Sequence, residues 1–152
     1  MKQTIGDKHP KLDYHYITDG IYIGTNQCCE MHFSEELIKK GISADISFEE
    51  KRLDQPFGVK FYVWLPVKNH TAPSQEQLKF GVAVLDQLVK IHKKVYVHCR
   101  SGHGRAPTLV AAYLVRGGAT SEAAEKFIKS KRPSIHLERV QRAALKKISQ
   151  WT

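Results

Sequence analysis

The sequence predicts an α/β fold in which a central, mostly parallel sheet is flanked by helices. Short apolar runs rich in β-branched and aromatic residues, typical of strands, alternate with longer segments whose apolar residues recur every three or four positions, typical of helices. Because helical connections join parallel strands, this alternation favours a parallel sheet. We expect a single domain over residues 1–152, since a chain of this length can bury roughly 68 to 70% of its unfolded surface without disulfides or a structural metal.

The first third of the chain is predicted to form a hairpin, a short helix and a strand. Residues 16–23 contain two extended pieces around the turn dipeptide Asp19-Gly20. A helix capped by its first serine is expected over residues 34–40, and a strand over residues 42–47. The short helix is expected to bury two apolar side chains, Leu37 and Ile38.

The middle of the chain is predicted to add two strands and a long helix. Residues 61–65 are apolar throughout and end before Pro66, so we expect a strand in the sheet interior, covered on both faces. Ser74 forms a predicted capping box with Gln77 at the start of the helix. A compact strand follows over residues 94–98. The apolar stripe expected to lie on the sheet is Leu78, Val82, Leu85 and Val89.

Three further helices complete the predicted fold. Residues 105–116 are apolar nearly all round, which predicts a central buried helix. Helices over residues 121–131 and 136–150 follow. Their inward residues are expected to be Phe127, Ile128, Leu137, Val140, Ala144, Leu145 and Ile148.

The charge of the chain favours anionic partners. Lys and Arg number 24 against 15 Asp and Glu, a formal net charge of +9. Phosphorylated substrates, anionic lipid and nucleic acid all fit this charge. The longest apolar stretch, residues 109–115, is too short to span a membrane, and the polar first ten residues lack the apolar core of a signal peptide. We therefore expect a cytoplasmic protein.

The three cysteines cannot form a paired disulfide framework. Two of them, Cys28 and Cys29, are adjacent, and adjacent cysteines bridge only with strain. We therefore expect reduced thiols.

The chemistry is expected in the loop between the strand at residues 94–98 and the helix at residues 105–116. Cys99 ends the strand, Arg105 begins the helix, and two glycines lie between them. Glycines let backbone N–H groups turn inward and a helix N-terminus adds positive potential, so the loop suits a tetrahedral dianion such as phosphate. Arg105 can bind that anion with a bidentate fork, and the same field favours the thiolate of Cys99. The alternative, a buried structural thiol and a surface arginine, is disfavoured by the combination of strand, glycines and helix.

Residues 98–105, His-Cys-x5-Arg, resemble the signature of the dual-specificity branch of the cysteine-dependent protein tyrosine phosphatase superfamily. The similarity extends to residues 19–24 and 69–74, to Arg132-Pro133 and to Gln141. It implies a protein tyrosine phosphatase-like fold and a reaction without metal or organic cofactor. In that reaction the cysteine attacks phosphorus, and water hydrolyses the resulting phosphocysteine.

The resemblance also implies roles for the residues around the nucleophile Cys99. Arg105 and the loop backbone would hold the phosphate oxygens. The implied substrate-binding residues are Arg100, Ser101, Gly102, His103, Gly104 and Ala106. The implied supporting residues are His98, which would order the loop, Thr108, and Gln141, which resembles a glutamine that positions water.

Two positions depart from the family pattern. The family's general acid is an aspartate, and Asn69 stands at that position, which removes a step worth typically 100- to 10,000-fold. His70 and His103 are the candidates to donate the proton instead. Ala106 replaces a hydroxyl residue that assists the thiolate, and Thr108 is the candidate substitute.

The sequence thus predicts a phosphatase for phosphotyrosine and for phosphoserine or phosphothreonine, impaired at Asn69. Two alternatives stay open. Arg100 and His103 make the loop basic, a feature similar to family members that act on phosphoinositides and other phospholipids. Asn69 and Ala106 instead favour a phospho-binding module that has lost turnover. We expect no nucleic-acid partner, because the remaining basic run is predicted to be solvated helix surface: Lys126, Lys129, Lys131, Arg132, Arg139, Arg142, Lys146 and Lys147.

Overall fold

A five-stranded sheet forms the centre of the computed structural model, which describes residues 11–151. The segment tested for a signal peptide, residues 1–10, lies outside the described residues. The strands lie in the order β1-β2-β5-β3-β4. Only the β1–β2 pair is antiparallel, so the expected mostly parallel sheet is confirmed. The strands are β1 (Tyr14–Thr18), β2 (Ile21–Gly24), β3 (Ile42–Ser47), β4 (Phe61–Trp64) and β5 (Lys94–His98).

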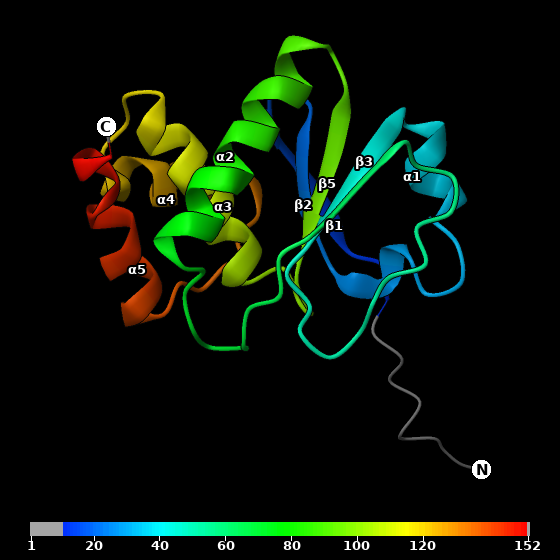
Figure 1. The fold of residues 1–152 in the computed structure, drawn as a ribbon, viewed down its shortest axis with the longest axis horizontal. Helices are drawn as coiled ribbons and strands as arrows, with labels where there is room; N and C mark the ends of the chain where they lie inside the picture. Colours follow the sequence, from blue (N-terminus) through cyan, green and yellow to red (C-terminus); the bar gives the residue numbers. More distant parts are fainter. Residues whose placement is uncertain (1–10, 152) are drawn as a thin grey trace.

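Helices cover both faces of this sheet (Figure 1). Helices α2 to α5 lie on one face, where α3 contacts β2 and β5, and α1 lies on the other face against β3. The helices are α1 (Glu35–Lys39), α2 (Gln75–Lys90), α3 (Arg105–Arg116), α4 (Ser121–Lys131) and α5 (Arg139–Lys146). Two short 3₁₀ helices, Asn26–Cys28 and Ile148–Gln150, complete the described elements.

Local sequence signals account for the turns and caps. Asp19 and Gly20 both have positive φ, 52° and 82°, as a tight hairpin turn requires, and they join β1 to β2. Ser74 caps α2 in the predicted capping box with Gln77. Helix α3 is buried over its first eight residues, which confirms the central buried helix.

The two faces of β5 supply two hydrophobic clusters. Val95 and Val97 pack into the large cluster under α2 to α5, whereas Tyr96 packs into the smaller cluster beside α1. Because side chains alternate along a strand, His98 shares the α1 face with Tyr96. The residue after it, Cys99, packs into the cluster on the α3 side.

The expected interior position of the strand at residues 61–65 is wrong. Strand β4 lies at the sheet edge, pairs only with β3, and leaves Phe61 and Trp64 about two fifths exposed. An apolar sequence indicates that a strand packs against a core, but it does not indicate whether the strand pairs with one neighbouring strand or with two. Here Trp64 keeps its indole N–H satisfied by the Glu49 carbonyl.

Several inward assignments on the helices are also wrong. Ile38, Phe127 and Val140 are exposed, while their neighbours on the same helices are buried. The expected helix over residues 136–150 begins later, because Glu138 caps α5 together with Gln141 and the preceding His136 N donates to the His103 carbonyl. After Lys146 the chain continues as a separate 3₁₀ helix. On α2 the buried position is Leu88, and Val89 is only partly buried.

Candidate active site

The structure places Cys99 at the carboxyl end of β5, the middle strand of the sheet. The loop that follows leads directly into α3, whose first residue is Arg105. Together they form a pocket of about 160 Å³. The predicted residues that line it are Cys99, Ser101, His103, Gly104, Arg105, Asn69, His70 and Gln141; two further lining residues, His136 and Glu138, were not predicted.

The backbone carbonyls of residues 100–104 are all held on the outer side of the loop. Each accepts a hydrogen bond from a neighbouring segment, at 2.7 to 3.1 Å. In chain order the donors are Asn26 N, Arg132 Nη2, Arg132 Nε, His136 N and Thr108 Oγ1. A trans peptide directs its N–H opposite to its carbonyl, so the N–H groups of residues 101–105 turn toward the pocket.

These inward N–H groups make the loop an anion site. Of these, the N–H groups of residues 101–104 donate to no backbone carbonyl in the described part of the chain. The N-terminus of α3 adds its positive end to the same point. The loop can therefore surround a tetrahedral anion directly in front of Cys99.

Gly102 is required by the loop geometry. Its φ is +70°, and a Cβ would lie 2.7 Å from the Gly24 carbonyl oxygen and 2.9 Å from Arg132 Nη2. Gly104 is confined in another way, because a Cβ there would lie 2.9 Å from the Gln141 amide. The glycines thus allow the loop to pack closely against its supports.

Arg105 is buried and anchored at one edge. Its Nη1 donates to the carbonyls of Phe48 and Val67, at 3.2 and 2.8 Å. The guanidinium also lines the pocket beside Cys99. One edge is therefore fixed by the protein, and the planar fork is held ready for two oxygens of a bound phosphate.

Arg132, expected on a solvated surface, is fully buried, so that expectation is wrong. Besides its two bonds to the loop carbonyls, it contacts His15 Nδ1 at 2.9 Å and Asp13 Oδ2 at 3.2 Å. Burial is possible because each of these acceptors satisfies part of the guanidinium. Its place in the Arg132-Pro133 resemblance was the one signal in the sequence.

His98 supports the loop from beneath. Its Nδ1 lies 3.3 Å from the Cys99 carbonyl oxygen, and its Nε2 faces Asp54 and Asp45 at 2.7 and 3.0 Å. Burial lowers the pKa of His98, but the two carboxylates outweigh it and raise the pKa to about 10. Neither aspartate was singled out by the sequence, because they come from distant segments.

Asn69, which the sequence resemblance aligned with the family's general acid, lines the pocket. Its backbone N–H donates to Glu50 at 2.8 Å, and its side-chain oxygen accepts from the His70 N–H at 3.0 Å. His70 has a positive φ of 67°, and its Nδ1 lies 2.9 Å from Glu138 Oε2. The structure therefore brings an amide and an oriented imidazole to the pocket edge.

The other predicted residues have more restricted roles. The Thr108 hydroxyl donates its hydrogen to the Gly104 carbonyl, so that hydrogen is not available to the Cys99 sulfur. Gln141 is buried and donates to the Thr71 carbonyl. Burial and the nearby Arg132 charge lower the pKa of His103, so His103 is a weaker proton carrier than an ordinary histidine.

The structure joins Cys28 and Cys29 in a disulfide, so the expectation of reduced thiols is wrong for this pair. The backbone after the 3₁₀ helix turns so that both buried sulfurs lie on the same side of the chain. Residue spacing alone did not indicate this turn.

Comparison with known proteins identifies the class. The family model described as "Polymorphic toxin system, DSP-PTPase phosphatase" matches residues 22–119, which include the loop and most of the sheet. The chain therefore belongs to this family of dual-specificity-type phosphatases.

No helix in the described residues is long and apolar enough to cross a membrane.

Individual relatives include lipid and protein phosphatases. The chain is 38% identical over 71 residues to the phosphatidylglycerophosphate phosphatase PTPMT1 of Arabidopsis thaliana, covering 46% of this chain and 21% of that protein. It is 36% identical over 56 residues to human dual specificity protein phosphatase 5, covering 36% and 15%. The chain spans between about one fifth and two fifths of the length of the first curated relatives it matches.

Solved structures share the fold. Human DUSP28 superposes with a TM-score of 0.80 at 17% identity, covering 90% of this chain and 95% of that one. PTPMT1 in complex with PI(5)P superposes with a TM-score of 0.77 at 22% identity, covering 90% and 94%. The protein tyrosine phosphatase-like architecture expected from the sequence is confirmed.

Proposed function

We propose that this protein hydrolyses phosphate monoesters through a phosphocysteine at Cys99. The observation that carries the proposal is the loop whose five carbonyls are held outward, which leaves its N–H groups around the point in front of the sulfur. The thiolate attacks phosphorus, the bond to the leaving oxygen breaks, and that oxygen takes up a proton. Water then attacks the phosphocysteine, releasing phosphate and restoring the thiolate.

Arg105 and the loop amides stabilise the transition state. Negative charge is spread over three equatorial phosphate oxygens, and preorganised donors in a confined site hold that charge without rearranging. The anchored edge of Arg105 keeps the fork in plane. No step of this mechanism uses a metal or an organic cofactor.

Proton delivery to the leaving group is the weak step. Asn69 cannot act as a carboxylic acid, so activity depends on how well the leaving oxygen bears negative charge. We infer that the remaining proton donation comes from His70. Its Nδ1 is engaged by Glu138, which orients the ring and leaves Nε2 as the atom available to the pocket.

The preferred substrates in this proposal are phosphorylated proteins, with phosphotyrosine cleaved faster than phosphoserine or phosphothreonine. An aryl oxide tolerates negative charge better than an alkoxide, and the pocket lacks the aspartate that would compensate. With Asn69 in place of an acid, the enzyme should therefore prefer aryl phosphate esters such as phosphotyrosine.

A phospholipid headgroup is the second candidate substrate. A cavity of about 260 Å³ adjoins the pocket and shares Asn69, His70 and Arg105 with it. Its other lining residues are the carboxylates Glu49 and Glu50 and the cations Arg100, Lys51 and Lys68, so with Arg105 the positive charges outnumber the negative ones. These cations favour a second phosphate near the one being cleaved. Relatives named as phosphatidylglycerophosphate phosphatases support this candidate.

A substrate panel tests the choice. The kcat/KM of the full chain is measured for a phosphotyrosine peptide, a phosphoserine peptide and a phosphoinositide in mixed micelles, with Arg100→Ala as the matched variant. We expect the phosphotyrosine peptide to be preferred and Arg100→Ala to change its kcat/KM by less than about threefold, since the Arg100 side chain is exposed. A lipid preference that Arg100→Ala removes would establish the second candidate. Binding of all three without turnover would indicate a phospho-binding module.

A further inference from the structure

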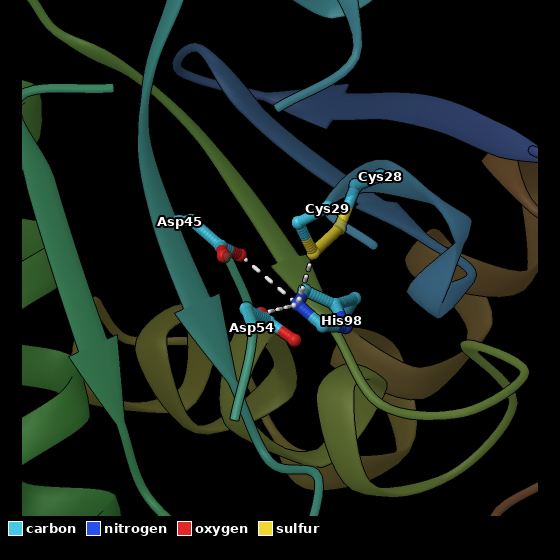
Figure 2. Close-up of side chains that lie close together, drawn as sticks. All are labelled: Cys28, Cys29, Asp45, Asp54 and His98. Atoms are coloured by element: carbon cyan, nitrogen blue, oxygen red, sulfur yellow. Dashed lines mark hydrogen bonds and ion pairs between the residues drawn. A yellow bond between two sulfur atoms is a disulfide. The ribbon is translucent and has the colours of Figure 1, made fainter. Parts of the chain in front are cut away.

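A second cluster of reactive side chains lies behind the active-site loop, on the α1 face of the sheet (Figure 2). Its five members are buried, and one potential ligand atom of each lies within 4.8 Å of those of the others. They come from separate parts of the chain: the C-terminal end of the first 3₁₀ helix, β3, the segment after β3, and the end of β5. The members are Cys28, Cys29, Asp45, Asp54 and His98. None of them lines the catalytic pocket.

More acceptor atoms converge on His98 Nε2 than one nitrogen can satisfy. Asp54 Oδ2 lies at 2.7 Å, Asp45 Oδ1 at 3.0 Å and Cys29 Sγ at 3.6 Å. A ring nitrogen carries at most one hydrogen, and here its hydrogen bond goes to Asp54. Apart from its ion-pair contact with His98 Nε2, the buried Asp45 carboxylate accepts no hydrogen bond on either oxygen within the described residues, although such groups are nearly always hydrogen-bonded.

We propose that the reduced form of this cluster binds a zinc ion through Cys29 Sγ, His98 Nε2 and the carboxylates of Asp45 and Asp54. A tetrahedral zinc with ordinary Zn–S and Zn–N distances holds those two ligand atoms about 3.6 Å apart. Cys29 Sγ and His98 Nε2 already have this separation. The same geometry places a carboxylate oxygen about 3.3 Å from that nitrogen, so the Asp54 and Asp45 oxygens, at 2.7 and 3.0 Å from His98 Nε2, would move away from it by roughly 0.3 to 0.6 Å.

The surroundings of the cluster suit a divalent cation. Arg52 Nη2 lies 3.2 Å from Asp54 Oδ1 and 3.8 Å from Cys29 Sγ. One thiolate and two carboxylates are therefore neutralised by Zn²⁺ together with this guanidinium. His98 Nδ1, opposite the metal-binding nitrogen, faces the Cys99 carbonyl and can donate to it, which is the usual arrangement for a ligating histidine.

The ligand set selects zinc over the abundant hard cations. Mg²⁺ and Ca²⁺ prefer sets made only of oxygen, whereas a sulfur, a nitrogen and two carboxylates in a closed site suit zinc. The ion would link the segments that carry Cys29, Asp45 and Asp54 to His98 at the end of β5, directly before Cys99. It would act on the loop through His98 and would touch no reacting atom.

Binding requires that the Cys28–Cys29 disulfide is first reduced. A cellular dithiol, such as the reduced form of a thioredoxin-type protein, supplies two electrons and two protons and is itself oxidised to a disulfide. Zinc then displaces the proton of the Cys29 thiol and the proton on His98 Nε2, and Cys28 stays a thiol. The disulfide and the metal are therefore alternative states of the same cluster.

Metal analysis of the full chain tests this proposal. The protein is reduced with a phosphine, and a thiol assay confirms three free thiols. It is then incubated with Zn²⁺, desalted and analysed for bound metal. Oxidised protein is treated in the same way. We expect one equivalent of zinc in the reduced protein and none in the oxidised protein. Cobalt in place of zinc should give a thiolate-to-cobalt absorption band. The comparison of two redox forms of one chain does not depend on the folding of a variant.

Variants assign the ligands. Cys29→Ser and Asp45→Asn should each weaken zinc binding by about 100-fold or more, since even partners of metal ligands contribute 10- to 100-fold. Cys99→Ser and the exposed control Asp86→Asn should retain zinc, with folding checked by circular dichroism. Absence of zinc from the reduced chain overturns the proposal. So does full zinc retention by folded Cys29→Ser and Asp45→Asn. Hydrolysis of an aryl phosphate is measured separately, so loss of zinc binding and loss of catalysis are distinguishable.

Discussion

The guanidinium of Arg132 donates from Nε to the Gly102 carbonyl at 3.0 Å and from Nη2, on the same edge, to the Ser101 carbonyl at 2.9 Å. This buried arginine thereby holds the middle of the phosphate loop with its amides inward. The loop that binds the anion is shaped by a cation that does not line the pocket.

Replacing Arg132 should therefore damage both stability and catalysis. Arg132→Ala leaves buried loop carbonyls without donors, and we expect a loss of about 3 to 5 kcal/mol in the free energy of unfolding, as for other broken buried charge networks. The kcat for an aryl phosphate should fall at least tenfold. Urea unfolding and steady-state kinetics measure the two effects. The adjacent exposed Lys131→Ala is the control and should change neither; equal behaviour of the two variants would contradict this role.

Gly102→Ala tests the close approach of the loop to β2. The added methyl group meets Gly24 and Arg132 at a φ that L-residues rarely adopt, so the loop must shift. We expect hydrolysis to be almost lost. Gly118→Ala is the matched control, because Gly118 also has positive φ, 119°, but a Cβ there meets nothing within 4 Å. That variant should cost about 1 to 2 kcal/mol of stability and no activity. Retained hydrolysis in Gly102→Ala would show that the loop tolerates displacement.

Arg105→Lys tests the bidentate fork. Lysine keeps the charge but cannot both donate to the carbonyls of Phe48 and Val67 and present two parallel N–H groups to phosphate. We expect kcat to fall by about 100-fold or more, the usual effect of removing a transition-state donor. A fall in affinity for sulfate with unchanged kcat would instead assign Arg105 to ground-state binding.

Asn69→Asp tests the missing acid. We expect a gain of about 100-fold or more on an alkyl phosphate and a smaller gain on an activated aryl phosphate. The variant should also acquire a fall in rate at high pH, as the new carboxylic acid loses its proton. Kinetics on both esters across pH measure this. If neither the leaving-group dependence nor the pH profile changes, this position does not supply the acid.

His70→Gln tests the donor that we infer in place of Asp. It should remove the residual activity on alkyl phosphates while leaving activated aryl phosphates nearly unchanged. His103→Gln, at the other predicted candidate, should have less effect on leaving-group dependence. A larger effect of His103→Gln would reverse the assignment.

The sequence predicted those parts of the site that are local in the chain. Strand β5, Cys99, the glycines and Arg105 are contiguous, so their spacing alone implies the turn and the helix start. Arg132 was missed as a buried residue because its burial depends on acceptors from β1 and the loop. The His98 cluster was missed for the same reason, since Asp45 and Asp54 come close to it only through strand pairing and a long connection.

Edge and interior positions were harder to predict than element type. The strand at residues 61–65 has the composition of a buried strand, yet no further strand covers β4 within the described residues. The outward side chains of α4 and α5, such as Phe127 and Val140, are apolar without being core. Single apolar residues on a surface are common, so hydropathy does not separate them from the core.

Rapid acid quenching followed by mass spectrometry detects a phosphocysteine at Cys99 itself. The full chain is mixed with an excess of activated aryl phosphate, quenched within the first turnover, digested and analysed for phosphorylated peptides. We expect one phosphoryl group on the peptide that contains Cys99, and none in Cys99→Ser, which still binds sulfate because the backbone amides remain. Turnover without that phosphopeptide, together with full activity of Cys99→Ser, would contradict a phosphocysteine mechanism.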